Sequence, residues 1–354
     1  MTKSVQGGGH VPNKLKVLVP DAHLRDLDVE RGVTGELIDY QVYDEIDAAA
    51  IPDEEWTSCD AILVWHRMKI TREVVSRLSR CRMIVRVGVG FDNVDTAACS
   101  ERGIPVSNVP NYGTTEVADH AIAMMLYLAR GLGTYQARIK ADPAHGFVAE
   151  NVPVVRRLRG GTFGAIGMGR IGTAIARRAA AHDMHVIYHD PFLPEGHELG
   201  LGYERVGSLD ELLARADVVS LHVPLSDATR FMMSDAQFQA MKPNSIFINI
   251  ARGKLVDVDA VYRTLLSGHI AAAGLDVLPN EPPMPLPPLL EAWRNGEEWL
   301  AGRFIVTPHA AFYSEAGYLD MRTFSAQMLV DYLVHGRLRN NVNPAWQHAT
   351  PSTR

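Results

Sequence analysis

The sequence has few cysteines, no long apolar run and no excess of positive charge. Its three cysteines, Cys59, Cys81 and Cys99, form no Cys-x-x-Cys pair, so they are interpreted as reduced thiols and not as disulfides or metal ligands. The longest apolar stretch, 121–129, is far too short to span a bilayer. The net charge of −6 gives no electrostatic reason to expect nucleic acid. The polar segment 1–13 does not resemble a signal peptide, and a cytoplasmic location is expected.

The chain of 354 residues is long enough for two domains, each with its own core. Short apolar runs form two sets of predicted strands. The first set covers 15–19, 40–43, 61–65, 83–87 and 105–107, and the second covers 163–166, 185–189, 218–223, 245–250, 271–275 and 304–306. Apolar runs separated by helices imply parallel sheets that are covered on both faces. The predicted fold class is therefore α/β, with two parallel-sheet domains.

Three further segments carry helix signals. Residues 114–130 are apolar almost all round, which predicts a helix buried between domains or subunits. Residues 208–211 fit a capping box at the start of another helix. The tail 315–335 is also predicted to be helical, and it could return to the first domain and make that domain discontinuous.

A glycine-rich turn lies near the middle of the chain, between a predicted strand at 163–166 and a predicted helix at 170–182. Gly167 permits the sharp turn, Gly169 lets the backbone approach a pyrophosphate, and Gly172 lets the helix pack close to the strand. The N–H groups at the start of this helix would face the phosphates. The turn predicts a dinucleotide-binding unit.

Asp190 follows the next predicted strand, 18 residues after Gly172. A carboxylate at this position can accept hydrogen bonds from both ribose hydroxyls of NAD and would repel the 2′-phosphate of NADP. The alternative is a solvated loop aspartate before Pro191. With the rest of the unit present, the sequence predicts NAD as the cofactor.

Three polar residues follow later predicted strands, namely Arg252, Glu281 and His309. Ligands of open parallel sheets bind outside the carboxyl ends of strands, so these side chains could converge on one crevice. Each also has a structural alternative: a salt bridge at a turn, a solvated carboxylate and a packing histidine. A zinc site at His182, His185 and His189 is not expected, because no cysteine or carboxylate pattern supports one.

The sequence resembles the D-isomer-specific 2-hydroxyacid dehydrogenase family over residues 15–345. The resemblance is carried by segments in the family's order, namely 87–95, 167–172, 216–224, 249–253, 275–277 with 281–282, and 307–309. His66 and the segment 309–315 are most similar to the branch that contains the C-terminal-binding-protein co-repressors. The resemblance implies two Rossmann-like or flavodoxin-like domains. An NAD-binding domain, 111–312, would be inserted into a discontinuous substrate domain, 14–110 and 313–345, and the protein would form a homodimer.

The resemblance also implies a mechanism for interconverting a D-2-hydroxy acid and its 2-oxo acid. His309 would give and take the proton, and Glu281 would orient the imidazole and favour its protonated form. Arg252 would hold the substrate carboxylate and polarise the carbonyl. The implied substrate-binding residues are His66, Val89, Gly90 and Phe312. The implied cofactor-binding residues are Thr114, Gly167, Gly169, Arg170, Ile171, Gly172, Asp190, His222, Val223, Pro224 and Asp276, with Asp276 at the nicotinamide carboxamide.

Two features depart from the family pattern. The segment 282–303 is longer than usual and contains Trp293, Trp299 and a helical stretch. It is interpreted either as a surface excursion or as a cover for the site or a partner subunit. Phe312 stands where the co-repressor branch has a tryptophan.

Two functions are weighed against each other. The first is an NAD-dependent dehydrogenase or 2-oxoacid reductase, and the alternative is an NADH-sensing binding module similar to the co-repressors. Formate dehydrogenase is a poor match, because that relative has a glutamine where Glu281 stands. Trp65 and Met68 suggest either an apolar substrate group or a role in the core. Arg67, Arg82 and Arg86 hint at a phosphate, with a structural pairing as the alternative for Arg86, so the 2-oxo acid stays open.

Overall fold

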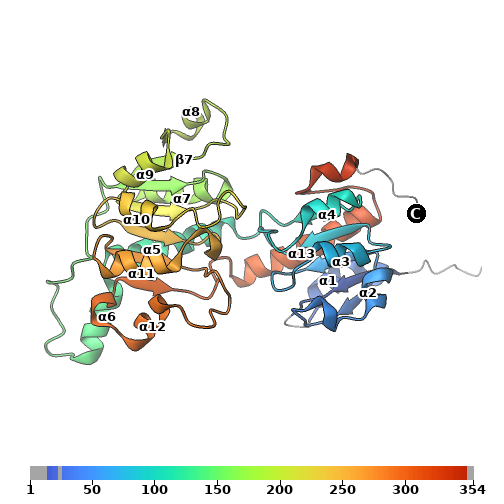
Figure 1. Cartoon of the computed structure of the whole chain (residues 1–354), viewed down its shortest axis with the longest axis horizontal. Helices are drawn as coiled ribbons and strands as arrows, with labels where there is room; N and C mark the ends of the chain where they lie inside the picture. Colours follow the sequence, from blue (N-terminus) through green and yellow to red (C-terminus); the bar gives the residue numbers. More distant parts are fainter. Residues whose placement is uncertain (1–13, 23–25, 349–354) are drawn as a thin grey trace, which may run out of the picture. The chain divides into compact units, whose positions relative to one another are not determined.

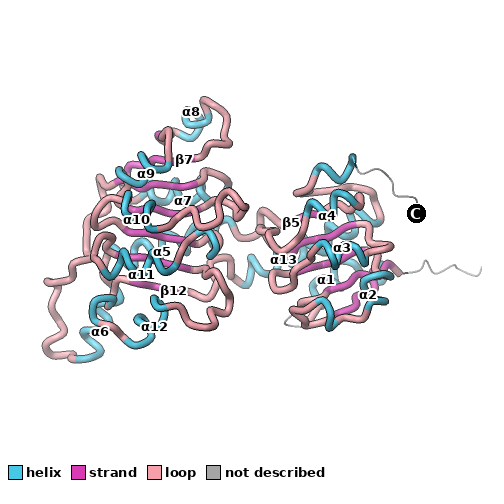
Figure 2. The backbone as a smooth tube through the Cα atoms, viewed as in Figure 1, coloured by secondary structure: helices cyan, strands magenta, loops and turns pink. Residues whose placement is uncertain are grey.

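A computed structural model describes residues 14–22 and 26–348, so the polar segment 1–13 lies outside the described residues. The chain divides into two compact units (Figure 1). Unit 1 comprises Met1–Tyr112 and Glu315–Arg354, and unit 2 comprises Gly113–Ser314. Figure 2 shows that each unit contains its own set of adjacent strands with helices around them.

Unit 1 contains a five-stranded parallel sheet in the order β2-β1-β3-β4-β5. Its strands are β1 (Leu15–Val19), β2 (Ile38–Val42), β3 (Ala61–Val64), β4 (Met83–Arg86) and β5 (Val106–Asn108). Its helices are α1 (Asp28–Thr34), α2 (Asp53–Ser58), α3 (Arg72–Arg77), α4 (Thr96–Glu101) and α13 (Glu315–Leu333), with short 3-10 turns at Gly35–Leu37, Ala48–Ala50 and Pro344–His348. Every residue of β3 and β4 is buried, because helices cover the sheet on both faces.

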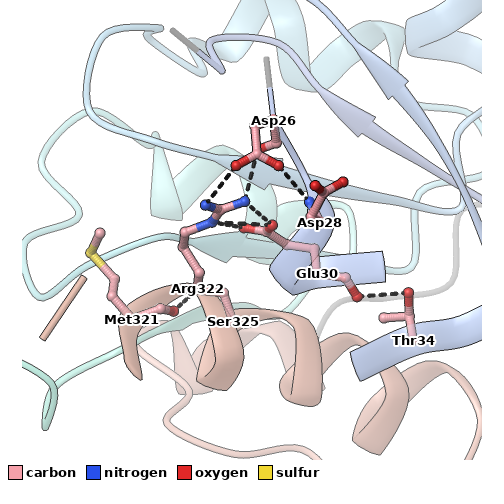
Figure 3. Close-up of polar contacts among 7 residues, drawn as sticks. All are labelled: Asp26, Asp28, Glu30, Thr34, Met321, Arg322 and Ser325. Carbon is pink, nitrogen blue, oxygen red and sulfur yellow. Dashed lines mark hydrogen bonds and ion pairs between the residues drawn. The ribbon is translucent and has the colours of Figure 1, made fainter. Parts of the chain in front are cut away.

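Helix α13 joins the first part of unit 1 through a buried ion pair with α1 (Figure 3). Arg322 donates from Nε to Glu30 Oε1 over 2.9 Å and from Nη2 to Glu30 Oε2 over 2.7 Å. Nη2 also donates to the Asp26 carbonyl over 2.7 Å. Glu30 is fully buried and Arg322 nearly so, and the two-pronged contact satisfies both charges away from water. This pair fastens the C-terminal helix to the N-terminal part of the same unit.

Unit 2 contains a seven-stranded parallel sheet in the order β12-β11-β10-β9-β6-β7-β8. Its strands are β6 (Thr162–Ile166), β7 (His185–His189), β8 (Glu204–Arg205), β9 (Val218–Leu221), β10 (Ile246–Asn249), β11 (Ala272–Leu275) and β12 (Phe304–Val306). Its helices are α5 (Thr114–Ala129), α6 (Leu132–Ala141), α7 (Arg170–Ala181), α8 (His197–Leu201), α9 (Leu209–Arg215), α10 (Asp235–Ala240), α11 (Val258–Leu266) and α12 (Pro288–Asn295), with 3-10 turns at Gly253–Leu255 and Glu298–Leu300. Two all-parallel sheets confirm the predicted α/β fold class.

Helices cover both faces of the sheet in unit 2. α5 and α7 pack on one face over a core that includes Phe163 and Ile248, and α9 to α12 cover the other over Phe238 and Phe247. The chain order reverses at the centre, where β6 lies between β7 and β9. The loops after β6 and β9 therefore run in opposite directions from the carboxyl end of the sheet. Ligands of such sheets bind between these two loops.

The structure corrects five details of the sequence interpretation. The segment 282–303 is a surface excursion only in part, because α12 buries Leu289 and Leu290 in the core of unit 2. The strand expected at 218–223 ends at Leu221, and the short strand β8 carried no recognisable signal. Helix α5 is buried within unit 2 itself, against the sheet and α7. At the expected capping box, the Ser208 hydroxyl accepts from the N–H of Glu211 as predicted, but the Glu211 carboxylate accepts from the N–H of Gly207 and not from that of Ser208. Over residues 14–22 and 26–348, no helix is long and apolar enough to cross a membrane.

Candidate active site

The glycine turn joins β6 to α7, and two of its glycines have packing reasons. Gly167 has a φ of +91°, and a Cβ there would lie 2.9 Å from Val223 Cγ1. A Cβ on Gly172 would lie 2.2 Å from the Gly167 carbonyl oxygen, so only glycine lets the helix approach this closely. At Gly169 a Cβ would meet no atom within 4 Å. The space beside Gly169, at the N-terminus of a 12-residue helix, suits a phosphate group.

Asp190 lies against this turn. β6 and β7 pair in a register that places Ile166 opposite His189, and Gly167 donates its N–H to the His189 carbonyl over 2.9 Å. The Asp190 carboxylate accepts from Met168 N through Oδ2 over 2.9 Å and from Phe192 N through Oδ1 over 3.0 Å. Each oxygen keeps further acceptor capacity, which suits a ribose with two hydroxyls.

The loop after β9 forms the opposite side of the turn. His222 donates its N–H to the Ile166 carbonyl over 2.8 Å, and Val223 contacts the position of Gly167. Both ring nitrogens of His222 are buried and, within the described residues, neither has a hydrogen-bond partner. Burial lowers the pKa of His222 to about 3, so the imidazole is neutral near neutral pH. The other residue named for this loop, Pro224, is exposed beside it.

The remaining cofactor candidates lie at helix starts. Arg170 and Ile171 are the first two residues of α7, with Arg170 exposed and Ile171 partly buried. Thr114 is the first residue of α5 and follows Gly113, which packs against the backbone of Phe312. These residues lie in unit 2 with the glycine turn.

His309 and Glu281 form a hydrogen-bonded pair. His309 Nδ1 lies 2.7 Å from Glu281 Oε2, and the other oxygen, Oε1, accepts from the N–H of Leu278 over 2.9 Å. Burial raises the pKa of Glu281, but the His309 imidazole, the Leu278 N–H and Arg252 outweigh that effect and leave the pKa below its usual value. Because a carboxylate only accepts hydrogen bonds, Nδ1 carries a proton and donates it to Glu281. Proton exchange with a ligand would therefore take place at Nε2.

Arg252 follows β10 in an extended conformation. Its Nη1 donates to the Ala251 carbonyl over 2.7 Å, and its own carbonyl accepts from Asn249 Nδ2 over 2.9 Å. Its positive charge is one of the factors that lower the pKa of Glu281. The structure thus brings Arg252, Glu281 and His309 together at the carboxyl ends of β10, β11 and β12.

Asp276 is almost fully buried just after β11 and supports the loop that carries His309. Its Oδ1 accepts from the Thr307 hydroxyl and from Ala310 N, and its Oδ2 accepts from Ala311 N. Oδ2 therefore keeps capacity for one more donor, such as a carboxamide. Phe312 follows on this loop, and its ring meets the His309 ring edge to face with centroids 6.2 Å apart.

The other substrate candidates lie in unit 1. His66 lies in the loop that follows β3. In this loop the N–H groups of Trp65, Arg67 and Met68 donate hydrogen bonds to the buried Asp21 carboxylate. Burial raises the pKa of Asp21, and these three N–H donors oppose that rise. Val89 and Gly90 follow β4, which pairs with β3 in the parallel sheet. Both loops therefore lie at the carboxyl edge of this sheet.

Sequence reasoning missed the supporting roles of Asp21, of Thr307 and of His120, whose Nε2 lies 3.0 Å from the Thr307 hydroxyl oxygen. An aspartate directly after a predicted strand, as at Asp21, is a usable signal for loop capping. Thr307 precedes Pro308 in a segment already singled out, but its hydroxyl contact depends on the register of two strands. Within the described residues, no group of three or more His, Cys, Asp and Glu side chains could hold a metal ion.

Comparison with known proteins gives consistent matches. Residues 122–311, more than half of the chain, match the family model "D-isomer specific 2-hydroxyacid dehydrogenase, NAD binding domain". The chain is 35% identical over 289 residues to a D-3-phosphoglycerate dehydrogenase of Methanocaldococcus jannaschii, covering 82% of this chain and 52% of that protein. It spans about half the length of the curated relatives it matches.

Two solved structures are similar over almost their whole length. D-lactate dehydrogenase from Aquifex aeolicus, complexed with NAD and lactic acid, is 30% identical with a TM-score of 0.80, and the match covers 92% of this chain and 99% of that one. An NADPH-dependent glyoxylate/hydroxypyruvate reductase from Sinorhizobium meliloti, in complex with NADP and malonate, is 28% identical with a TM-score of 0.81, covering 94% and 98%.

Proposed function

This chain belongs to the D-isomer-specific 2-hydroxyacid dehydrogenase family, and from that premise we propose that it interconverts a D-2-hydroxy acid and its 2-oxo acid, with His309 as general acid and base. The observation that carries the proposal is the 2.7 Å contact between His309 Nδ1 and Glu281 Oε2. It fixes the orientation of the imidazole, and hydride transfer to a carbonyl requires a proton donor for the carbonyl oxygen. When bound, the nicotinamide cofactor supplies or accepts the hydride.

The side chains of the chain divide the remaining work. His309 donates a proton from Nε2 to the oxygen of the reduced carbonyl, and removes it in the oxidation direction. Glu281 holds the imidazole ring and stabilises its positive charge. Arg252 binds the substrate carboxylate and polarises the carbonyl with its planar donors. His66, Val89, Gly90 and Phe312 are the residues that we assign to substrate binding.

We assign the cofactor preference to NAD over NADP. The Asp190 carboxylate is held by the N–H groups of Met168 and Phe192 beside the glycine turn. A negative charge fixed at this point accepts ribose hydroxyls and repels a 2′-phosphate. Gly167, Gly169, Arg170, Ile171 and Gly172 would approach the pyrophosphate, and the other contacts would come from Thr114, the backbone of His222, Val223 and Pro224, and Asp276.

A screen of 2-oxo acids with the purified protein tests the proposal. The panel contains glyoxylate, pyruvate, hydroxypyruvate, its phosphorylated form and bulkier apolar analogues, each with NADH and with NADPH. The expected result is NADH oxidation with at least one acid and formation of the D-hydroxy acid, identified by chiral chromatography. NADH binding without turnover across the whole panel would contradict the proposal and favour the binding-module alternative.

We also infer a homodimer. Within the described part of the chain, α6 buries none of its residues, and Leu132 and Ile139 are exposed on it. Phe147, in the loop that follows, is 83% exposed. An exposed apolar group of this kind favours association with a second copy. Light scattering after size-exclusion chromatography should give twice the chain mass, and the monomer mass would refute the inference.

A further inference from the structure

We propose that Thr307 and His120 are positioning residues, which hold the Asp276 carboxylate and through it the loop that carries His309. This inference rests on the proposed role of His309 in proton transfer. The contacts join α5, the end of β11 and the end of β12, all within unit 2.

The loop needs such support because its backbone is strained at His309. His309 has a φ of +52°, in the left-handed region that residues with a Cβ adopt rarely. A residue keeps that conformation only when its surroundings determine it strongly. The position of the imidazole thus depends on what holds the backbone of the loop.

Asp276 supplies most of that hold. Its carbonyl accepts from His309 N over 2.7 Å, its Oδ1 from Ala310 N over 2.8 Å, and its Oδ2 from Ala311 N over 3.0 Å. One residue therefore binds the N–H groups of three successive loop residues. The carboxylate is 1% exposed, so its orientation depends on protein donors and not on bulk water.

Thr307 is the side-chain donor that sets this orientation. β11 and β12 pair with Leu275 opposite Val306, which brings the next residues, Asp276 and Thr307, side by side. The Thr307 hydroxyl lies 2.5 Å from Asp276 Oδ1. A charge-assisted hydrogen bond of this length is stronger than a neutral one. It aligns Oδ1 toward β12 and leaves Oδ2 directed at Ala311.

His120 completes the arrangement from α5. Its Nε2 lies 3.0 Å from the Thr307 hydroxyl oxygen and 3.7 Å from Asp276 Oδ1. A hydroxyl has one hydrogen, and here it is donated to Asp276, so His120 must be the donor to Thr307. The network therefore assigns a proton to Nε2 of His120. The direction of donation runs from His120 to Thr307 to Asp276.

The test compares Thr307→Val with two matched variants. Valine keeps the shape of threonine and removes the donor, Thr307→Ser restores a hydroxyl, and Thr264→Val makes the same change at a buried position of α11 outside the network. The role of His120 is tested with His120→Phe, which removes the donor to Thr307 and keeps a planar ring. The first readout is hydrogen exchange of the amides of His309, Ala310 and Ala311 in protein without cofactor, which needs no turnover.

Exchange at these amides should become about tenfold to a hundredfold faster in Thr307→Val, because a hydrogen bond to a charged group is lost. It should change less in His120→Phe and stay at the wild-type rate in Thr307→Ser and Thr264→Val. The second readout is steady-state kinetics with an active 2-oxo acid. Here kcat should fall by a similar factor with KM within about threefold, because the carboxylate-binding groups are untouched.

Wild-type exchange rates and kcat in Thr307→Val would overturn the inference. An equal loss in Thr264→Val would also overturn it, since the effect would then be one of general stability. Faster exchange in Thr307→Val in a protein whose wild type turns over no acid supports the positioning network and rejects the proposed function. The two failures are therefore distinguishable.

Discussion

The neutral buried imidazole of His222 should make the stability of unit 2 depend on pH by a predictable amount. Burial lowers the pKa of this group from 6.5 to about 3 in the folded protein. Between these values the unfolded chain binds a proton that the folded chain does not, so stability falls as the pH falls below 6.5. The loss ends near the folded pKa.

The magnitude follows from the unfolded pKa alone as long as the folded group stays neutral. From about pH 8 to about pH 5, the contribution of His222 to the free energy of unfolding should fall by about 2 kcal/mol. For a unit of this size, that corresponds to about 4–8 °C in Tm.

The assay compares the wild type with His222→Leu by scanning calorimetry at the two pH values. Leucine fills a similar volume and does not titrate, and the other histidines titrate equally in both proteins and cancel in the difference. The Tm of the wild type should drop by about 4–8 °C more than that of the variant. Parallel drops in the two proteins would refute the reasoning.

Three further predictions concern the ion pair and the nucleotide turn. Arg322→Met should lower the free energy of unfolding of unit 1 by about 3–5 kcal/mol in denaturant unfolding, because Glu30 is left buried and unpaired. Adding Glu30→Leu should recover most of the loss, and an unchanged stability of Arg322→Met alone would contradict the prediction. Asp190→Ser should raise the ratio of kcat/KM with NADPH to that with NADH by about tenfold or more, and an unchanged ratio would remove Asp190 from cofactor selection. Gly169→Val should leave the Tm unchanged, since the position is open, yet weaken NADH binding by about tenfold or more in a fluorescence titration, and unchanged binding would exclude the turn from the phosphate site.

The fold was predictable because its strands are covered on both faces. β3 is a continuous apolar run and β4 is apolar up to Arg86 at its end, and such runs between helical segments indicate a parallel sheet that is covered on both faces. Strand ends were less predictable. The expected strand 218–223 ends in the apolar residue Val223, but His222 and Val223 leave the sheet after Leu221 and pack on the glycine turn. Apolar character alone does not distinguish pairing in a sheet from packing beside it.

The candidate site was predictable to the level of residues that follow strands. Arg252, Glu281 and His309 lie at the carboxyl ends of neighbouring strands, an arrangement set by strand order that the alternation of elements already implies. The contacts that hold them were not predictable. The Thr307–Asp276 hydrogen bond depends on the register of β11 and β12, and the contact of His120 depends on the way α5 lies on the sheet. Neither leaves a local pattern in the chain.

If His309 transfers the proton, its loss should stop turnover and leave the nucleotide site intact. The most direct measurement determines both turnover with the best 2-oxo acid and the NADH Kd, for the wild type, His309→Gln and the surface control His145→Gln. Turnover of His309→Gln should fall by about a hundredfold or more, with the NADH Kd within about threefold and the control unchanged. Turnover of His309→Gln within about threefold of the wild type would contradict the role of His309 in proton transfer.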